Sequence, residues 1–325
     1  MIIVTGGDGF IGTHLVERLA EAGHKVLAVN GAHGTNCSPS TWSLPKNIFL
    51  SILDAQTLEQ FFSLLRRYLE TTDDIEHVTS IIHLGACSDT LNDDWKYLGI
   101  NNYKYSTEVF QLCKRFSIPL IYASSAATYG SCKMWQKSKE EESLFTLCPM
   151  NKYGLSKLLF DQYVDTISKN ISTLNFRWHG LRFFNVYGYH EAHKDKMASM
   201  PWKFLNQGSY KKNIMIYDID AYRDFVYVED VVDVIWYLIF NPCVQSGIYN
   251  VGSGIATNVR DVAKIASEMT GSNVAQMLTP QKLLDQYQYF TQADIAKLRG
   301  EGYQKQFCSI KEGMEQLRLR MIRSK

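Results

Sequence analysis

The sequence lacks the cysteine spacing of either a disulfide framework or a zinc site. Its seven cysteines are odd in number and scattered, and no two of them form a Cys-x-x-Cys pair. They are Cys37, Cys87, Cys113, Cys132, Cys148, Cys243 and Cys308. Scattered thiols of this kind are typical of a reducing compartment. We therefore expect a cytoplasmic protein with no structural disulfide and no bound metal.

The chain also lacks an excess of charge and a long apolar run. Its formal net charge is only +1, so neither nucleic acid nor an anionic membrane is an expected partner. The most apolar stretch, VVDVIWYLIF at residues 231–240, is too short to cross a bilayer and contains Asp233. The first residues, MIIVTGG, are typical of a strand and a turn rather than of a signal peptide. Internal repeats, low-complexity tracts and Pro/Ser-rich linkers are absent from the sequence.

Apolar and polar residues alternate in a pattern that is typical of an α/β protein. Of the 325 residues, 46% are hydrophobic and 13% are aromatic, which is enough for a large core and for one big or two coupled domains. Strands and amphipathic helices alternate through about the first 170 residues, as in repeated βαβ units around a parallel sheet. Expected strands lie at 1–5, 25–30, 49–54, 80–86 and 119–125, and expected helices at 14–24, 57–70, 105–116 and 151–167.

This pattern predicts an α/β fold with a Rossmann-type doubly wound parallel sheet and a smaller, interwoven C-terminal substrate lobe. Residues 1–175 would form the dinucleotide-binding domain, to which a segment near residues 225–246 returns. Residues 176–325, where loops lengthen and elements shorten, would form most of the substrate lobe.

A glycine-rich turn, TGGDGFIG, lies between the first expected strand and the first expected helix. It places Gly6, Gly9 and Gly12 three residues apart. Glycines at these positions permit a tight turn and let backbone N–H groups at the helix N-terminus approach a pyrophosphate. A turn without a ligand is the alternative, but the strand–turn–helix context favours a dinucleotide site.

The ends of the second and third strands bear on which nicotinamide cofactor is bound. The second strand ends at Asn30, where an acidic residue usually binds the ribose hydroxyls of NAD. Asparagine removes the charge that would repel the 2′-phosphate of NADP, but it supplies no cation to hold that phosphate. Asp54, at the end of the third strand, either contacts the adenine amine or caps the following helix.

Two further stretches carry candidate reacting groups. In NKYGLSK, Tyr153 and Lys157 are one helical turn apart and leave the same face of a helix. The ammonium group should lower the pKa of the phenol below its usual value of about 10, which would make Tyr153 a proton shuttle. In YASSAATYG, Ser125 ends a strand at the carboxyl edge of the sheet, where it could bind the same substrate oxygen. A Ser/Thr turn that satisfies only its own backbone is the alternative.

TGGDGFIG, YASSAATYG and YGLSK, in this order and spacing, resemble the extended short-chain dehydrogenases/reductases that act on nucleotide sugars. Longer stretches, among them HEAHKDKMAS, RDFVYVEDVVDV and YQYFTQAD, resemble the ADP-L-glycero-D-manno-heptose 6-epimerase family and together cover nearly the whole chain. The resemblance implies a bacterial cytoplasmic isomerase that interconverts the two C6 epimers of ADP-heptose, a lipopolysaccharide core precursor, by transient oxidation and re-reduction. It also implies an NADP cofactor and a homo-oligomer, which is pentameric in characterised relatives.

The same resemblance assigns roles to individual residues. Ser125, Tyr153 and Lys157 match the catalytic triad, and Lys194 matches a second acid/base group. Without the resemblance, Lys194 would be a solvated lysine of the EAHKDK loop. Cofactor contacts would come from Gly6, Gly9, Phe10, Ile11, Gly12, Asn30, Asp54, Leu84, Gly85, Ala86, Cys87, Ser88, Asn101, Lys157 and Val186. Substrate contacts would come from Asn185, Lys196, Lys203, Tyr217, Arg223 and Tyr287, although Arg223 could instead pair locally with Asp224.

The sequence departs from the family where NADP would be held. Asn36 and Leu58 stand at the positions of two lysines that bind the 2′-phosphate, so NAD remains possible. Lys203 stands where the family has a histidine that touches substrate.

The same scaffold also carries other functions, which the sequence favours to different degrees. A dehydratase is disfavoured, because Ala126, Ala127 and Thr128 occupy the place of the Thr-Asp-Glu run that elimination generally needs. A 4-epimerase and an epimerase of a differently activated heptose both remain open. A non-enzymatic dinucleotide sensor could keep the glycine turn, but it would not need the Tyr153–Lys157 pair.

Overall fold

The computed structural model describes residues 1–30, 50–54, 63, 78–132, 134–140, 143–170, 176–211, 213–280 and 288–323 of the chain. Three positions singled out above, Asn36, Leu58 and Tyr287, lie outside these residues, as does nearly all of the helix expected at 57–70.

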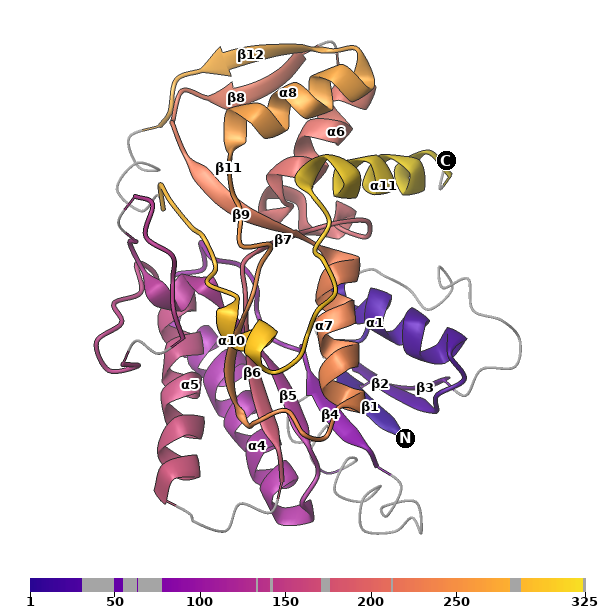
Figure 1. Ribbon diagram of the computed structural model, residues 1–325, viewed down its shortest axis with the longest axis vertical. Coiled ribbons are helices and arrows are strands. Elements are labelled where there is room, and N and C mark those ends of the chain that lie inside the picture. Colours follow the sequence, from indigo (N-terminus) through magenta and orange to yellow (C-terminus); the bar gives the residue numbers. More distant parts are fainter. Residues whose placement is uncertain are drawn as a thin grey trace.

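A parallel sheet of seven strands forms the centre of the larger lobe (Figure 1). Its strands run in the order β10-β6-β5-β4-β1-β2-β3, and every neighbouring pair is parallel. The order reverses between β1 and β4, which confirms the predicted doubly wound fold and locates the ligand crevice of such folds at the carboxyl ends of these strands. The strands are β1 (Ile2–Thr5), β2 (Val26–Asn30), β3 (Leu50–Asp54), β4 (Ser80–His83), β5 (Leu120–Ser125), β6 (Trp178–Phe183) and β10 (Gly247–Val251).

Helices cover both faces of this sheet because successive strand residues point to opposite sides. Ile2 and Val4 pack into one core with apolar residues of helices α1 and α7, whereas Ile3 packs into a second core with residues of α4 and α5. These helices span Phe10–Glu21 (α1), Tyr105–Phe116 (α4), Lys152–Asn170 (α5) and Val228–Phe240 (α7). A short helix α3 (Trp95–Leu98) and a π-helical turn η3 (Gly99–Lys104) lead into α4.

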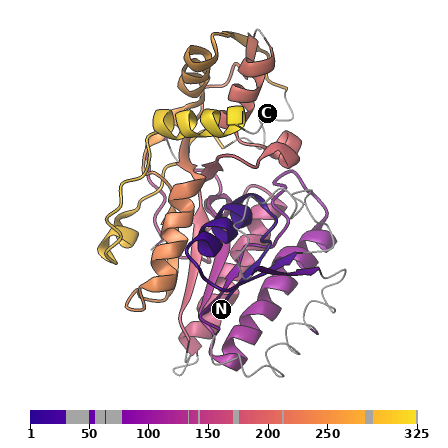
Figure 2. The same cartoon turned by 90° about the vertical axis from the view of Figure 1, so that its right-hand side faces the viewer.

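The smaller lobe stands above the carboxyl edge of the large sheet in Figures 1 and 2. It has its own core, which includes Phe204, Ile214 and Val262. Its strands are β7 (Asn185–Tyr187), β8 (Asn213–Tyr217), β9 (Tyr222–Tyr227), β11 (Ala256–Asn258) and β12 (Asn273–Met277), and its helices are α6 (Met200–Tyr210), α8 (Val259–Thr270) and α11 (Ile310–Arg323). The short helix α10 (Ala296–Gly300) lies beside β10.

The chain passes between the lobes more than once. Strands β6 and β10 join the large sheet although both lie beyond residue 175, and α7 returns to pack on α1. The division of the chain into domains by residue range stays a prediction.

Candidate functional site

A cleft of about 2040 Å³ opens at the carboxyl ends of β1, β4 and β5 and is walled on its other side by the smaller lobe. Its lining includes the glycine turn, residues 84–93, the end of β5, the start of α5 and residues 193, 194 and 196–200. A typical small-molecule pocket has a volume of about 300–1,000 Å³. The cleft therefore has room for a dinucleotide together with a second large ligand.

Nearly all of the predicted site residues line this one cleft, although they come from segments far apart in the sequence. The side chains of Asn30, Asp54 and Tyr287 lie outside the described part of the chain. Asn30 and Asp54 end neighbouring strands and are register partners in the β2–β3 pair. The individual roles assigned above stay predictions.

The glycine turn leaves no room for side chains. Gly6 has a φ of +65°, and a Cβ placed on it would lie 2.8 Å from the Cα of Gly85 in the loop after β4. A Cβ on Gly12 would lie 2.0 Å from the carbonyl oxygen of Gly6. Helix α1 makes its first internal N–H bond from Thr13 to the Gly9 carbonyl, 2.9 Å long. The N–H groups before Thr13 therefore remain outside the helical ladder, and they suit a pyrophosphate.

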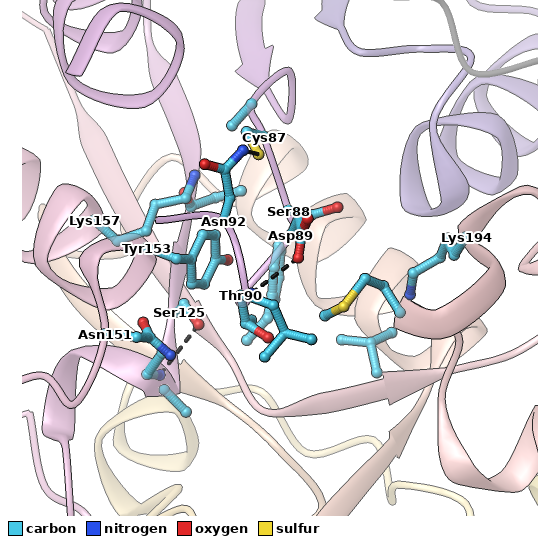
Figure 3. Close-up of a pocket in the computed structure, with 18 of the residues that line it drawn as sticks. Cys87, Ser88, Asp89, Thr90, Asn92, Ser125, Asn151, Tyr153, Lys157 and Lys194 are labelled. Carbon is cyan, nitrogen blue, oxygen red and sulfur yellow. Dashed lines mark hydrogen bonds between the residues drawn. The ribbon is translucent and has the colours of Figure 1, made fainter. Parts of the chain in front are cut away.

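Tyr153 lies beside Ser125 at the floor of the cleft, with Lys157 on the same helix, while Lys194 enters from the opposite side (Figure 3). Burial raises the pKa of the Tyr153 phenol; a hydrogen bond with Ser125 acts in the other direction, and a charge on Cys87 would raise it further. Ser125 also begins a 3₁₀ turn, η4 (Ala126–Tyr129), by accepting a 3.1 Å hydrogen bond from the Ala127 N–H. The alternative Ser/Thr turn is therefore present, and it coexists with the contact to the phenol.

The expectation that Lys157 lowers the pKa of Tyr153 is wrong for this structure. The Lys157 ammonium donates instead to the Ala123 carbonyl at 2.9 Å, and burial of the phenol dominates. Burial also lowers the pKa of Lys157 to about 8, against the opposing effects of Asp161 and Cys87. Burial away from water therefore shifts the pKa of Tyr153 and of Lys157 more than the charge of either group shifts the pKa of the other.

A buried carboxylate attaches helix α5 to the sheet. Asp161, one turn after Lys157 on α5, accepts hydrogen bonds from the Ser124 hydroxyl at 2.9 Å and the Tyr122 hydroxyl at 3.1 Å, both on β5. It also accepts one from Nε of Arg182 on β6 at 3.1 Å. These bonds fix the side of α5 that carries Lys157 relative to two strands.

Lys194 is not the solvated lysine that the EAHKDK composition suggests. Its Nζ donates to Oε2 of Glu191 at 3.0 Å and lies 4.7 Å from the centre of the Phe10 ring. The side chain of Glu191 is completely buried. Glu191 was not predicted from the sequence, although its spacing of three residues from Lys194 was a usable signal.

A second missed residue is Asn102, in the π-helical turn beside the predicted Asn101. Its side chain is buried and accepts a 2.8 Å hydrogen bond from the Cys87 N–H. It also donates to the Cys87 carbonyl at 3.1 Å and to the Ser156 hydroxyl at 3.0 Å. Asn102 thus ties the loop after β4 to the helix that carries Tyr153, but nothing in the INNYKYST pattern distinguishes it from Asn101.

The smaller lobe supplies the remaining predicted substrate contacts. Arg223, on β9, donates to the Tyr222 carbonyl at 3.1 Å. The neighbouring Asp224 is buried, and its carboxylate accepts hydrogen bonds from the N–H groups of Ser253, Gly254 and Ala293. Lys203 donates to the Lys196 carbonyl at 2.6 Å. In the described part of the chain, no group of three or more His, Cys, Asp or Glu residues is placed to hold a metal ion, and no helix is long and apolar enough to span a bilayer.

Comparison with known proteins places this architecture among nucleotide-sugar enzymes. The chain is 37% identical over 336 aligned residues to the ADP-L-glycero-D-manno-heptose-6-epimerase of Fusobacterium nucleatum, with 97% of this chain and 96% of the relative covered. Its structure resembles that of the Helicobacter pylori ADP-L-glycero-D-manno-heptose-6-epimerase with a TM-score of 0.77 and 26% identity, over 100% of this chain and 96% of the other.

Fold similarity extends beyond heptose enzymes. The UDP-N-acetylglucosamine 4-epimerase of Methanobrevibacter ruminantium has a TM-score of 0.81 at 22% identity, over 100% of this chain and 98% of the other. Residues 2–252 match the description "NAD dependent epimerase/dehydratase family". With the full-length relative, this match confirms the family predicted from the motifs: the chain belongs to the NAD dependent epimerase/dehydratase family.

Proposed function

We propose that the protein interconverts ADP-D-glycero-D-manno-heptose and ADP-L-glycero-D-manno-heptose by transient oxidation and re-reduction at C6. The observation that carries this proposal is the position of Lys194, which lines the same cleft as Tyr153 but belongs to a different segment and enters from the opposite side. A second acid/base group in that place suits an enzyme that must handle one oxygen in two orientations. The full-length relative from Fusobacterium nucleatum, whose name states this activity, supports the choice of sugar.

The chemistry needs a planar carbon, and a bound nicotinamide supplies a reversible acceptor for the C6 hydride. Tyr153 would take the hydroxyl proton as the ketone forms, with Ser125 holding the same oxygen. C6 lies outside the sugar ring, so rotation about one bond turns the other carbonyl face toward the returning hydride while the nucleotide stays bound. The rotated oxygen then points elsewhere, and Lys194 would exchange its proton there.

The residues of the glycine turn fit a dinucleotide: a Cβ on Gly6 or Gly12 would strike the protein's own backbone and open the turn, and the N–H groups of residues 10–12 lie outside the helical ladder, where a pyrophosphate can accept from them. For the cofactor we propose NADP, with NAD also accepted, since Asn30 lacks the charge that would repel a 2′-phosphate. By resemblance we also propose a cytoplasmic homo-oligomer that acts in lipopolysaccharide core precursor synthesis.

The direct test is to incubate the purified protein with each ADP-heptose epimer separately and to follow the C6 proton by NMR. We expect the same mixture of epimers from either starting compound. Tyr153→Phe should abolish interconversion but leave cofactor bound, because the change removes one proton acceptor and little volume. Absence of turnover in the wild-type protein, or near-wild-type turnover in Tyr153→Phe, would contradict the proposal.

A further inference from the structure

The loop between β7 and α6 is folded around one carboxylate. Glu191 is 0% exposed, and four hydrogen-bond donors face it. Oε1 accepts from the Gly188 N–H at 3.0 Å and from the Ser199 hydroxyl at 2.7 Å. Oε2 accepts from the Ser199 N–H at 2.7 Å and from Nζ of Lys194 at 3.0 Å. A buried carboxylate is tolerated when its oxygens are satisfied in this way.

Of the four donors, the Lys194 ammonium is the one with a chemical function to perform. Its side chain is 19% exposed, so the charged end reaches the cleft while the carboxylate behind it is closed to water. The ring of Phe10, from the glycine turn, lies against the same ammonium at 4.7 Å. A lysine carries a flexible four-carbon stem that samples many rotamers when free. Here a fixed anion on one side and a ring on the other define one position for Nζ.

The backbone beside Lys194 is also unusual. Asp195 has a φ of +43° and a ψ of −111°, a conformation that non-glycine residues seldom adopt. Such conformations persist only where surrounding contacts impose them, and they concentrate at functional sites. The two bonds from Ser199 to Glu191 span the strained residue, so the carboxylate that fixes the ammonium also closes the loop around it.

We infer that Glu191 is a positioning residue that holds the Lys194 ammonium at the wall of the cleft, ready to meet the rotated C6 oxygen. The inference rests on the proposed function, because it takes Lys194 to be the second acid/base group. Glu191 touches neither substrate nor cofactor in this scheme and acts only through Lys194. The competing interpretation is that Glu191 merely closes the loop.

Two reactions separate these interpretations. One is epimerisation of ADP-heptose, which requires both Tyr153 and Lys194. The other is dismutation of an ADP-activated hexose with a C6 aldehyde, in which one molecule is reduced to the alcohol while a second, as its hydrate, is oxidised to the acid. Dismutation needs no inversion at C6. A variant that lacks only one acid/base group can therefore retain it, whereas a collapsed cleft cannot.

We expect Glu191→Gln to behave like Lys194→Met in both assays. The kcat for epimerisation should fall at least about 30-fold with KM changed less than about threefold, because the substitution displaces a group used in the reaction and leaves substrate binding intact. The double variant Glu191→Gln/Lys194→Met should dismutate within about threefold of Lys194→Met alone, because effects that act through one residue are not additive. Ser199→Ala is the control for loop closure: it removes one bond to Oε1 and the 3.3 Å capping bond from the Trp202 N–H of α6. It leaves the contact between Oε2 and Lys194, so it should epimerise within about threefold of wild type.

Glutamine has one carbonyl oxygen in place of two carboxylate oxygens, so it can accept from only one of the two backbone N–H groups that face Glu191. The Glu191→Gln variant could therefore fail to fold, and its thermal unfolding is measured together with its activity. If that variant does not fold, Glu191→Asp carries the test, because it keeps the charge but withdraws it by one methylene. It should lose at least about tenfold in epimerisation and retain dismutation. Wild-type epimerisation by either Glu191 variant would overturn the inference, as would a further loss of dismutation in the double variant or an equal loss in Ser199→Ala. Failure of the wild-type protein to epimerise would instead refute the proposed function and the inference with it.

Discussion

The ion pair between Asp161 and Arg182 is a site where a single substitution should strongly destabilise the fold. Both side chains are 0% exposed, and they join α5 to β6 at 3.1 Å. The guanidinium also lies 4.5 Å from the centre of the Tyr129 ring. Asp161→Asn would keep the shape of the side chain and leave the Arg182 cation buried without its counter-charge. The helix that carries Tyr153 and Lys157 would then be oriented less firmly against the sheet.

The size of the effect follows from general values for buried ion pairs. Removing one partner costs about 3–5 kcal/mol, because the other charge stays out of water. A chain of 325 residues unfolds with an entropy of about 0.7 kcal/mol per kelvin at the average per-residue value. The Tm should therefore fall by about 4–7 °C. Replacing both partners, as Asp161→Leu with Arg182→Met, should recover more than half of the loss, since neither charge is then buried.

The assay is differential scanning calorimetry at pH 7 on the wild type, on Asp161→Asn, on the single variants Asp161→Leu and Arg182→Met, and on the double variant that combines these two. Asp165→Asn is the control, because Asp165 is on the same helix and pairs with Lys169, whose side chain is 74% exposed. An exposed pair of this kind contributes about 0–1 kcal/mol, which corresponds to a shift of about 1 °C. Equal shifts for Asp161→Asn and Asp165→Asn, or losses that simply add in the double variant, would refute the argument.

Three further outcomes are expected. Gly6→Ala should weaken cofactor binding at least tenfold in calorimetric titration, because the new Cβ would meet the loop at Gly85 and Gly6 has a positive φ; unchanged affinity would mean that this turn does not hold the cofactor. Asn30 and the missing lysines should keep the preference for NADP over NAD below about a thousandfold, or about 4 kcal/mol, and a larger ratio in titrations with both cofactors would reveal unseen phosphate ligands. The pKa of Lys157 is lowered from 10.5 to about 8 in the folded chain. Between these two pH values the unfolded chain binds one more proton at this lysine than the folded chain does, so Lys157 should contribute a free energy of unfolding that rises with pH from about 8 to about 10.5. Denaturant titrations of Lys157→Met across this range should lack that contribution, and identical profiles would contradict the pKa shift.

The large sheet could be predicted from the sequence because its strands are short, apolar and separated by amphipathic helices. The glycine turn could be placed because only glycine fits where Gly6 meets Gly85. The pairing in the smaller lobe could not be predicted. Strands β7 and β11 have three residues each, too few to show a period. The parallel pair of β8 and β12 joins segments separated by three other strands and two helices.

The shift of the Tyr153 pKa was missed for a different reason. Spacing along a helix shows which charged neighbour a side chain has, and Lys157 is indeed one turn from Tyr153. It does not show how much water the tertiary structure leaves around them, and here burial is the larger effect on both groups. The direction of such a shift depends on packing between elements that are distant in the sequence, so a motif identifies the reacting groups better than it identifies their proton affinities.

The burial of Glu191 is a second feature that the local sequence does not predict. In HEAHKDKMAS, charged residues outnumber apolar ones, and such a composition is typical of a solvated loop. The loop nevertheless buries one of its carboxylates, because Gly188 and Ser199 turn their backbone N–H groups toward it. Side chains on loops are generally held less firmly than those on helices or strands. A buried anion on which the surrounding backbone converges can hold a lysine in one place, and this gives the cleft a defined ammonium opposite Tyr153 from a short, kinked 3₁₀ segment (Ala192–Met197) rather than from an α-helix.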